Sequence, residues 1–504
     1  MSSAPLSMAS SFVPDVWGWI TSLPPFTQWN TNSMSLCICA PTSTQSSMNL
    51  SIIKNSPTKN PYITFSIFAD LHVPISLWTS APIPLKTKTQ QSLDEDDLVG
   101  LFFDIINVVL NYGPNKKSSL RFPPIQISEN FKDVFNLVFL TLVFLICIYE
   151  SPNDLRRRCV DYLKTQLTSS KSKETSKLLV RILGSNLEEQ WMRTLNLAVT
   201  NWIIELQSLN RSFKAITPLF SYAVSASSLW KVQLYCPVVA MSMVDPNSTT
   251  QDERLLFSLK YQQLESVIQL AYKVIFRENS IDVMVNVDNI RCDVTPLASE
   301  PLMAERGYGS EEKHFPARVS LKLTPTLQSD ILSVTVSKSS NNPTHEVGIE
   351  KALEGSFDPP NSYFGLHVST TESITMSMKP WKFEQSVYGV SANLNWFLHD
   401  GINGREVFSS KPSKISLLQP RAWFKDRYSS AYRPFTKQGG VIFAGDEYGD
   451  SVWWKVCAGA LGKTMEWEIT GSIWLTYWPN KQRTFYTETR KLEFRELLYL
   501  SLPK

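Results

Sequence analysis

Apolar side chains recur at two different spacings along this chain of 504 residues, and the spacing changes near Trp230. Over residues 94–230 they recur every three or four positions, which is typical of helices that bury one face. From Lys231 onward they recur at every second position, which is typical of strands with one buried face. The chain is therefore expected to build two kinds of hydrophobic core.

The helical part opens on four consecutive carboxylates, beginning at Asp94. Carboxylates are favoured at a helix N-terminus because they face unpaired N–H groups and the positive end of the helix dipole. Helices joined by short connections then follow, and no fixed sequence period indicates a named repeat family. The spacing predicts helices over residues 94–109, 128–150, 154–167, 175–183 and 186–206.

Strand patterns occur on both sides of the helical part. Residues 31–90 carry four short apolar runs separated by turn clusters rich in proline and serine. The clearest strand of the chain covers residues 465–477, and a turn at Pro479 leads into a second strand over residues 484–494. Two such strands with one apolar face predict a hairpin of an antiparallel sandwich. The simplest way to bury the runs before the helices is to add them to these later sheets.

These patterns predict an α+β fold, in which a helical bundle or solenoid-like module is inserted into an antiparallel β-sandwich assembly. Residues 1–30 are expected to be a disordered lead-in, and residues 31–90 a β segment that joins the C-terminal sheets. Residues 94–230 form the helical module. Residues 231–504 are expected to form one or two sandwiches.

The amino-acid composition makes several classes of function less probable for this protein. The 49 basic and 46 acidic residues give a net charge of +3, which supplies no field for a polyanion, so nucleic acid is not an expected partner. The seven cysteines are scattered and odd in number, which favours a reducing compartment over a disulfide framework. The first twenty residues lack the lysine and arginine of a signal peptide, so secretion is not expected. No nucleotide fingerprint indicates a cofactor.

The longest uncharged apolar run, residues 134–149, raises the question of a membrane. Its sixteen residues would span about 24 Å as a helix, short of the bilayer core of about 30 Å, which favours a buried core helix. The basic residues that follow are the kind that anchor a spanning helix on its cytoplasmic side. The alternative is therefore a membrane span or shallow docking through Phe139, Leu142, Phe144, Arg156, Arg157 and Arg158.

Tryptophan is the most concentrated aromatic residue, with eight of fifteen within one fifth of the chain near its C-terminal end. Trp467 is in phase with the apolar face of its strand and is expected in the core. Trp474 and Trp478 fall on the opposite, wet face with Glu466 and Glu468. Exposed tryptophans can stack on sugar rings, so these four residues form a candidate ligand site, although structural packing is the simpler interpretation.

Candidate metal ligands occur in a single compact loop, where Asp446, Glu447 and Asp450 could bind calcium. Their spacing is not that of an EF-hand, so a solvated turn is the simpler interpretation. The five histidines do not pair at metal-ligand spacing, and no nucleophile motif accompanies them. The sequence indicates no catalytic residue.

Five segments of the chain look familiar: residues 16–26, 33–39, 130–155, 285–294 and 467–486. Together they resemble a family of uncharacterised land-plant proteins, along nearly the whole chain. Some members of that family carry the label "membrane protein". The resemblance implies no known active site, so it assigns no role to any residue.

The sequence thus predicts a non-catalytic binding or scaffolding protein with a protein partner, cytoplasmic or membrane-associated. Large aromatic β surfaces and helical stacks without polar catalytic clusters suit recognition better than chemistry. A second hypothesis is a carbohydrate-binding or carbohydrate-active protein that uses the tryptophan-rich sheets. A third is an integral membrane protein with one span at residues 134–149.

Overall fold

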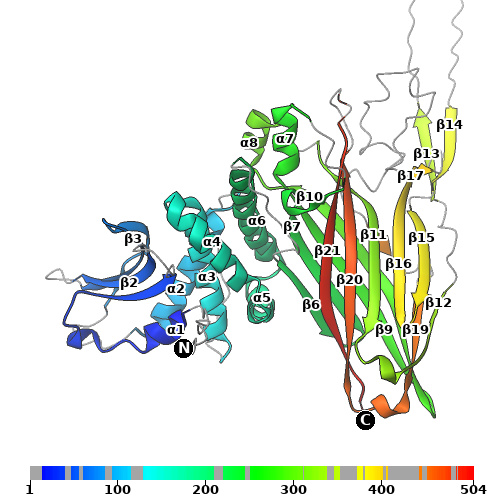
Figure 1. The fold of residues 1–504 in the computed structure, drawn as a ribbon, viewed down its shortest axis with the longest axis horizontal. Coiled ribbons are helices and arrows are strands. Elements are labelled where there is room, and N and C mark those ends of the chain that lie inside the picture. Colours follow the sequence, from blue (N-terminus) through cyan, green and yellow to red (C-terminus); the bar gives the residue numbers. More distant parts are fainter. Residues whose placement is uncertain are drawn as a thin grey trace, which may run out of the picture. The chain divides into compact units, whose positions relative to one another are not determined.

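The structure is a computed structural model in which helices and antiparallel sheets both occur, so the predicted α+β class is confirmed. Its contacts divide the chain into two compact units, residues 1–213 and residues 214–504 (Figure 1). The described residues are 14–39, 47–55, 61–85, 93–114, 129–208, 220–244, 250–309, 312–337, 345–351, 372–378, 381–400, 405–406, 442–444, 451–477, 484 and 486–503.

The first unit contains a five-stranded antiparallel sheet, in the order β1-β2-β3-β4 with β5 beside β3. Its strands are β1 (Ser33–Cys39), β2 (Ser47–Asn55), β3 (Tyr62–Asp70), β4 (Ile75–Thr79) and β5 (Ile83–Pro84). The strands were predicted, but their partners differ from the prediction that residues 31–90 join the C-terminal sheets. Neighbours linked by short connections pair with one another at a lower entropic cost than strands more than a hundred residues away.

Residues 14–30 are described and contain a helix, so this part of the lead-in that was expected to be disordered over residues 1–30 is folded. Helix α1 (Val16–Thr21) begins at Asp15, whose side chain accepts a hydrogen bond of 2.9 Å from the Gly18 N–H. The ring of Trp17 packs edge-on against two phenylalanines of a later helix, with centroids 5.4 and 5.3 Å away. The cap and these aromatic contacts explain the order.

The predicted helices are present, and α3 (Phe131–Tyr149) is their centre. Fifteen of its nineteen residues are buried, and it contacts α1, α2, α4, α5 and α6. Helix α3 is long and apolar enough to cross a membrane, yet 83% of its most apolar window is buried among its neighbours. The neighbouring helices are α2 (Glu95–Asn111), α4 (Asn153–Leu167), α5 (Ser170–Leu183) and α6 (Ser185–Ser208).

The second unit is one antiparallel β-sandwich. Its first sheet has the order β12-β19-β10-β9-β7-β6, with β18 beside β10. These strands are β6 (Phe220–Ala226), β7 (Leu229–Pro237), β9 (Gln262–Phe276), β10 (Ser280–Pro296), β12 (Ile331–Val336), β18 (Ile442–Ala444) and β19 (Ser451–Cys457). Because β6 begins at residue 220, the helical module ends earlier than the predicted boundary at residue 230.

The second sheet has the order β15-β16-β11-β20-β21-β8, with β17 beside β16. Its strands are β8 (Ser242–Met243), β11 (Phe315–Pro325), β15 (Trp381–Tyr388), β16 (Ser391–Asp400), β17 (Arg405–Glu406), β20 (Thr464–Tyr477) and β21 (Glu488–Ser501). A separate pair is formed by β13 (His345–Lys351) and β14 (Glu372–Met378), and two short helices are α7 (Glu253–Lys260) and α8 (Glu300–Arg306).

A single hydrophobic core joins the two sheets of the sandwich. Trp467 of β20 is fully buried, as predicted, and its ring lies 5.4 Å from Trp230 and 6.1 Å from Trp454 on the opposite sheet. The pairing of β20 with β21 also confirms the predicted hairpin. The side chains on one face of β20 are therefore buried in the core, and those on its opposite face point away from the core.

We expect Leu142→Ala to lower the free energy of unfolding by about 2–5 kcal/mol, because the side chain is fully buried in the helical bundle and its removal leaves a cavity. Urea titration of the full chain in the absence of detergent measures the change. Lys132→Ala, at an exposed position of the same helix, is the control and should change the value by less than about 0.5 kcal/mol. Equal stabilities of the two variants would contradict a packed α3.

Candidate functional site

The outer faces of β11, β20 and β21 form a polar surface in the middle of the second sheet. Their register aligns side chains in rows that cross all three strands. Three such rows are Arg318, Trp474 and Lys491; Ser320, Ser472 and Glu493; and Lys322, Thr470 and Arg495. Short hydroxyl side chains therefore lie between longer charged ones.

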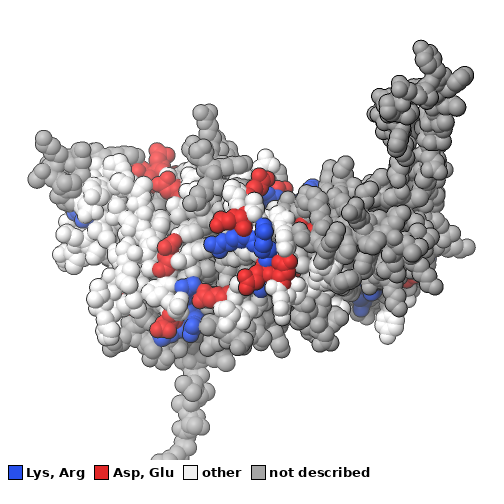
Figure 2. Space-filling model, turned by 90° about the horizontal axis from the view of Figure 1, so that it is seen from above, with Lys and Arg blue, Asp and Glu red and all other residues white. Residues whose placement is uncertain are grey.

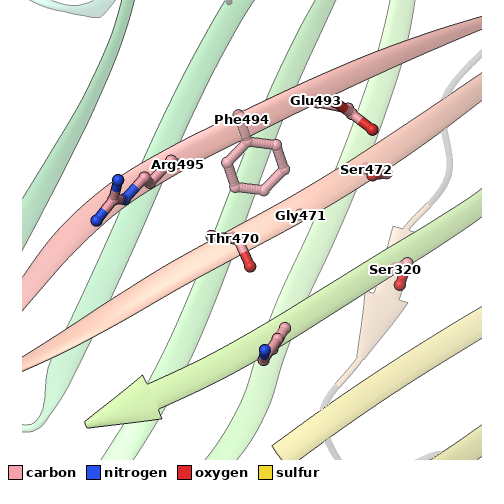
Figure 3. Close-up of a pocket in the computed structure, with 8 residues that line it drawn as sticks. Ser320, Thr470, Gly471, Ser472, Glu493, Phe494 and Arg495 are labelled. Atoms are coloured by element: carbon pink, nitrogen blue, oxygen red, sulfur yellow. The ribbon is translucent and has the colours of Figure 1, made fainter. Parts of the chain in front are cut away.

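A hollow of about 410 Å³ lies at the centre of this surface, and we call it the polar hollow. Figure 3 shows the side chains that line it on three adjacent strands. Ser320 lies on β11, Thr470 and Ser472 lie on β20, and Glu493 and Arg495 lie on β21. The hollow exists because short side chains occupy the middle row and long ones its margins. It is an open depression of the surface, accessible from solvent.

Close packing on the inner side of the sheet supports the floor of the polar hollow. Gly471 faces the ring of Phe494 on β21, and a Cβ atom at this glycine would lie 2.3 Å from the ring. Only glycine therefore leaves room for the ring, which is itself buried. The backbone of β20 and β21 is thus fixed beneath the polar hollow.

Trp474 lies on the outer face, but two basic side chains already contact its ring. The Arg318 guanidinium is 4.3 Å from the ring centroid, and the Lys491 ammonium is 5.2 Å away. Arg318 also lies 4.6 Å from the ring of Phe397 on β16. Cations over aromatic faces at these distances attract the ring electrons. Trp474 therefore positions cations beside the polar hollow, and a sugar could stack on it only by displacing one of them.

The two predicted glutamates on this face have different partners. Glu468 forms an ion pair with Arg495, whereas Glu466 accepts a hydrogen bond of 3.0 Å from the Thr326 hydroxyl. Glu493 is paired with Lys491. The other predicted members of the ligand and metal sites, Trp478, Asp446, Glu447 and Asp450, lie outside the described residues.

Lys322 is the basic residue of this surface that remains available to a ligand. Its side chain is exposed, and it forms no ion pair with any other residue of the described part of the chain. No sequence pattern singles out Lys322, because it acquires its place only when β11 pairs with β20. A lysine at an outward strand position is otherwise an ordinary surface residue.

The residues proposed for membrane contact lie in the first unit. Phe139, Leu142 and Phe144 are all buried within the helical bundle. Arg156 donates hydrogen bonds of 2.7 Å to Glu205 of α6 and of 2.7 Å to the Asn153 side chain. Arg157 and Arg158 are exposed on α4. Lipid contact by the three apolar residues would require the bundle to open, so it stays a hypothesis.

Charges of both signs are mixed on the surface. Figure 2 shows basic and acidic side chains lying next to one another on the described part of one face. Ion pairs such as Lys171 with Asp133, at 3.0 Å, account for part of this mixing in the helical bundle. Mixed charges are typical of a solvated surface.

A second polar cluster, which no pattern in the sequence indicates, is buried at one end of the sandwich. The side chain of His314 is fully buried. Its Nε2 atom lies 2.7 Å from a carboxylate oxygen of Glu488, and its Nδ1 atom lies 2.9 Å from Oε1 of the Gln262 side chain. Tyr486 and Arg490 donate further hydrogen bonds of 2.6 and 3.1 Å to the same carboxylate. His314 and Glu488, which meet here, are 174 positions apart in the sequence.

Electrostatics explain why this cluster is stable. Burial raises the pKa of Glu488, but the hydrogen bonds and charges of His314 and Arg490 outweigh burial and hold that pKa well below its usual range. Burial lowers the pKa of the His314 imidazole, and the hydrogen bond to Glu488 opposes this shift. Because two acceptors 2.7 Å apart would repel, one proton lies between them. Every oxygen of the carboxylate is used, so the cluster joins strand ends and offers no reactive group.

Comparisons with known proteins identify no relative that informs this site. No protein-family model matches the chain, and no curated protein matches it. One solved structure, described as a pore forming protein, has 8% sequence identity and a TM-score of 0.21, over 56% of this chain and 99% of that chain. The Clostridium perfringens NetB toxin in its membrane-inserted form has 6% identity and a TM-score of 0.18, over 56% and 97% of the two chains. Likeness this low bears on neither fold nor function.

We expect Glu488→Gln to lower the free energy of unfolding by about 3–5 kcal/mol near pH 7, because it leaves the mostly buried Arg490 guanidinium without its counter-charge and His314 without its charged acceptor. The lowered pKa means that the carboxylate stabilises the fold fully above its unfolded pKa of about 4.3, and progressively less as the pH falls below it. The difference from the wild type should therefore shrink below about pH 4.

Urea titrations at several pH values measure this effect. Glu493→Gln, at an exposed position of the same strand, is the matched control and should cost at most about 1 kcal/mol. The difference in free energy of unfolding between the wild type and Glu488→Gln is followed down to about pH 2.5, roughly two units below the ordinary pKa of a glutamate. A difference that stays constant over this range would contradict the stabilising role of the Glu488 charge.

Proposed function

We propose that this protein is a non-catalytic binding protein that holds a carbohydrate in the polar hollow on β11, β20 and β21. The observation that carries the proposal is the group of three short hydroxyl side chains, Ser320, Thr470 and Ser472, that lie among charged ones in an open hollow of about 410 Å³. A hydroxyl both donates and accepts hydrogen bonds, which matches the hydroxyls of a sugar ring. The volume is within the usual range for ligand sites.

Binding is better supported than catalysis by the partners of the nearby carboxylates. Glycoside hydrolysis generally uses two carboxyl groups, one of which donates a proton to the leaving group. Here Glu468 is paired with Arg495, and Glu493 with Lys491, so each carboxylate is held by a basic side chain. Neither is arranged as a proton donor toward the polar hollow.

A protein partner is a second candidate, which the sequence also predicts. Leu497 and Tyr499 are 38% and 43% exposed on the same outer face of β21, next to the polar hollow. Such side chains would add apolar contact area for a folded partner. The expected location stays cytoplasmic or membrane-associated, and the free thiols of all seven cysteines support a reducing compartment.

We expect Ser472→Trp to abolish carbohydrate binding, because the indole would fill the polar hollow. An array of neutral and acidic oligosaccharides, probed with the full chain, measures binding, and at least a tenfold loss is expected. Ser333→Trp is the matched control, since Ser333 is an exposed serine on β12 of the other sheet. Circular dichroism of both variants checks their fold. If the wild type binds no oligosaccharide, or if Ser472→Trp binds as the wild type does, the proposal is wrong.

A further inference from the structure

We infer that the carbohydrate held by the polar hollow is acidic, and that Lys322 and Arg495 bind its carboxylate. This inference rests on the proposed function and concerns which class of sugar the site selects. It begins from the charges around the hollow. Four basic side chains and two carboxylates surround it: Arg318, Lys322, Lys491 and Arg495, with Glu468 and Glu493. The surroundings are therefore net positive, which favours an anionic ligand.

The positions of Lys322 and Arg495 suit a single carboxylate. Both lie in one row, on either side of Thr470, which pairs with each of them. Neighbouring strands are about 4.8 Å apart, so the two long side chains can converge above the threonine between them. The Arg495 guanidinium can bind a carboxylate through two parallel hydrogen bonds, while the Lys322 ammonium contributes a compact charge.

The partner of Arg495 does not prevent this contact. Arg495 is paired with Glu468, but its side chain is 70% exposed. An ion pair in such a solvated position contributes only about 0–1 kcal/mol, so a ligand carboxylate can compete for the guanidinium. Lys322 has no such competitor among the described residues, and its charge is available without exchange.

The remaining rows contain the side chains that would distinguish an acidic sugar from a simple anion. Ser320 and Ser472 lie one row away from Lys322, about 7 Å along the strands, where ring hydroxyls of the same ligand would lie. Arg318 and Lys491 at the next row are held over the ring of Trp474. They therefore contribute long-range charge rather than a contact to the bound carboxylate.

The test compares a hexasaccharide of galacturonic acid with the hexasaccharide of galactose, which differs from it by a hydroxymethyl group in place of each carboxylate. Calorimetric titration of the full chain should give at least tenfold tighter binding of the acidic sugar at low salt. Added salt should weaken this preference, because the contacts are exposed.

Three variants distinguish the roles of the residues. Lys322→Met should weaken binding of the acidic hexasaccharide several-fold and leave that of the neutral one unchanged, whereas Lys273→Met, at an exposed lysine on β9, should change neither. Glu468→Gln should tighten binding of the acidic sugar several-fold, because it removes the carboxylate that competes for Arg495.

The outcomes separate the inference from the proposed function. Equal affinity for the two hexasaccharides, both lost in Ser472→Trp, would overturn acid recognition while carbohydrate binding in the polar hollow would stand. Weaker binding of the acidic sugar by Glu468→Gln would also overturn the inference. Absence of binding to either hexasaccharide and to every other oligosaccharide of the array would remove the proposed function, and the inference with it.

Discussion

The burial of Trp467 between the two sheets is the constraint on which the outer surface depends. Its ring packs against Trp230 and Trp454 from the opposite sheet. Because side chains of a strand alternate between its faces, burial of this residue places Trp474 and Glu468 outside. A shift of pairing by one residue would move those polar groups into the core, at a cost of several kcal/mol each by the roughly 2–7 kcal/mol range for unpaired polar groups.

The sequence predicts well what depends on local periodicity. The alternation around Trp467 locates β20 and its apolar face, and the spacing in residues 134–149 locates α3. The features that the sequence does not predict depend on which distant segments pair or pack together. The strands of residues 31–90 were found but were assigned to the wrong sheet, because periodicity identifies a strand without identifying its neighbour. Likewise Asp15 looks like any polar residue until the helix that it caps is seen to pack.

In the candidate site, too, some features follow from local periodicity and others from the pairing of strands. The outward position of Trp474 followed from alternation alone, whereas the cations over its ring come from strands on either side. Their register depends on a bulge in β11 between Pro316 and Arg318. Proline lacks the N–H that a regular ladder requires, and a bulge accommodates it while it shifts the residues that follow. Arg318 faces Trp474 at the start of the regular ladder after that shift, a pairing that no periodicity in the sequence reveals.

The hairpin of β20 and β21 carries charged side chains in two environments, one buried and one exposed to solvent. The two environments give these charges different roles. Glu488 is buried at the end of β21, where three partners use both of its oxygens and removal of the charge is costly. Glu468 lies in the open middle of β20, where its pair with Arg495 is solvated and weak. The first arrangement stabilises the fold because it cannot exchange partners. The second can exchange its partner for a ligand without cost to the fold, so recognition is better placed on the exposed pair.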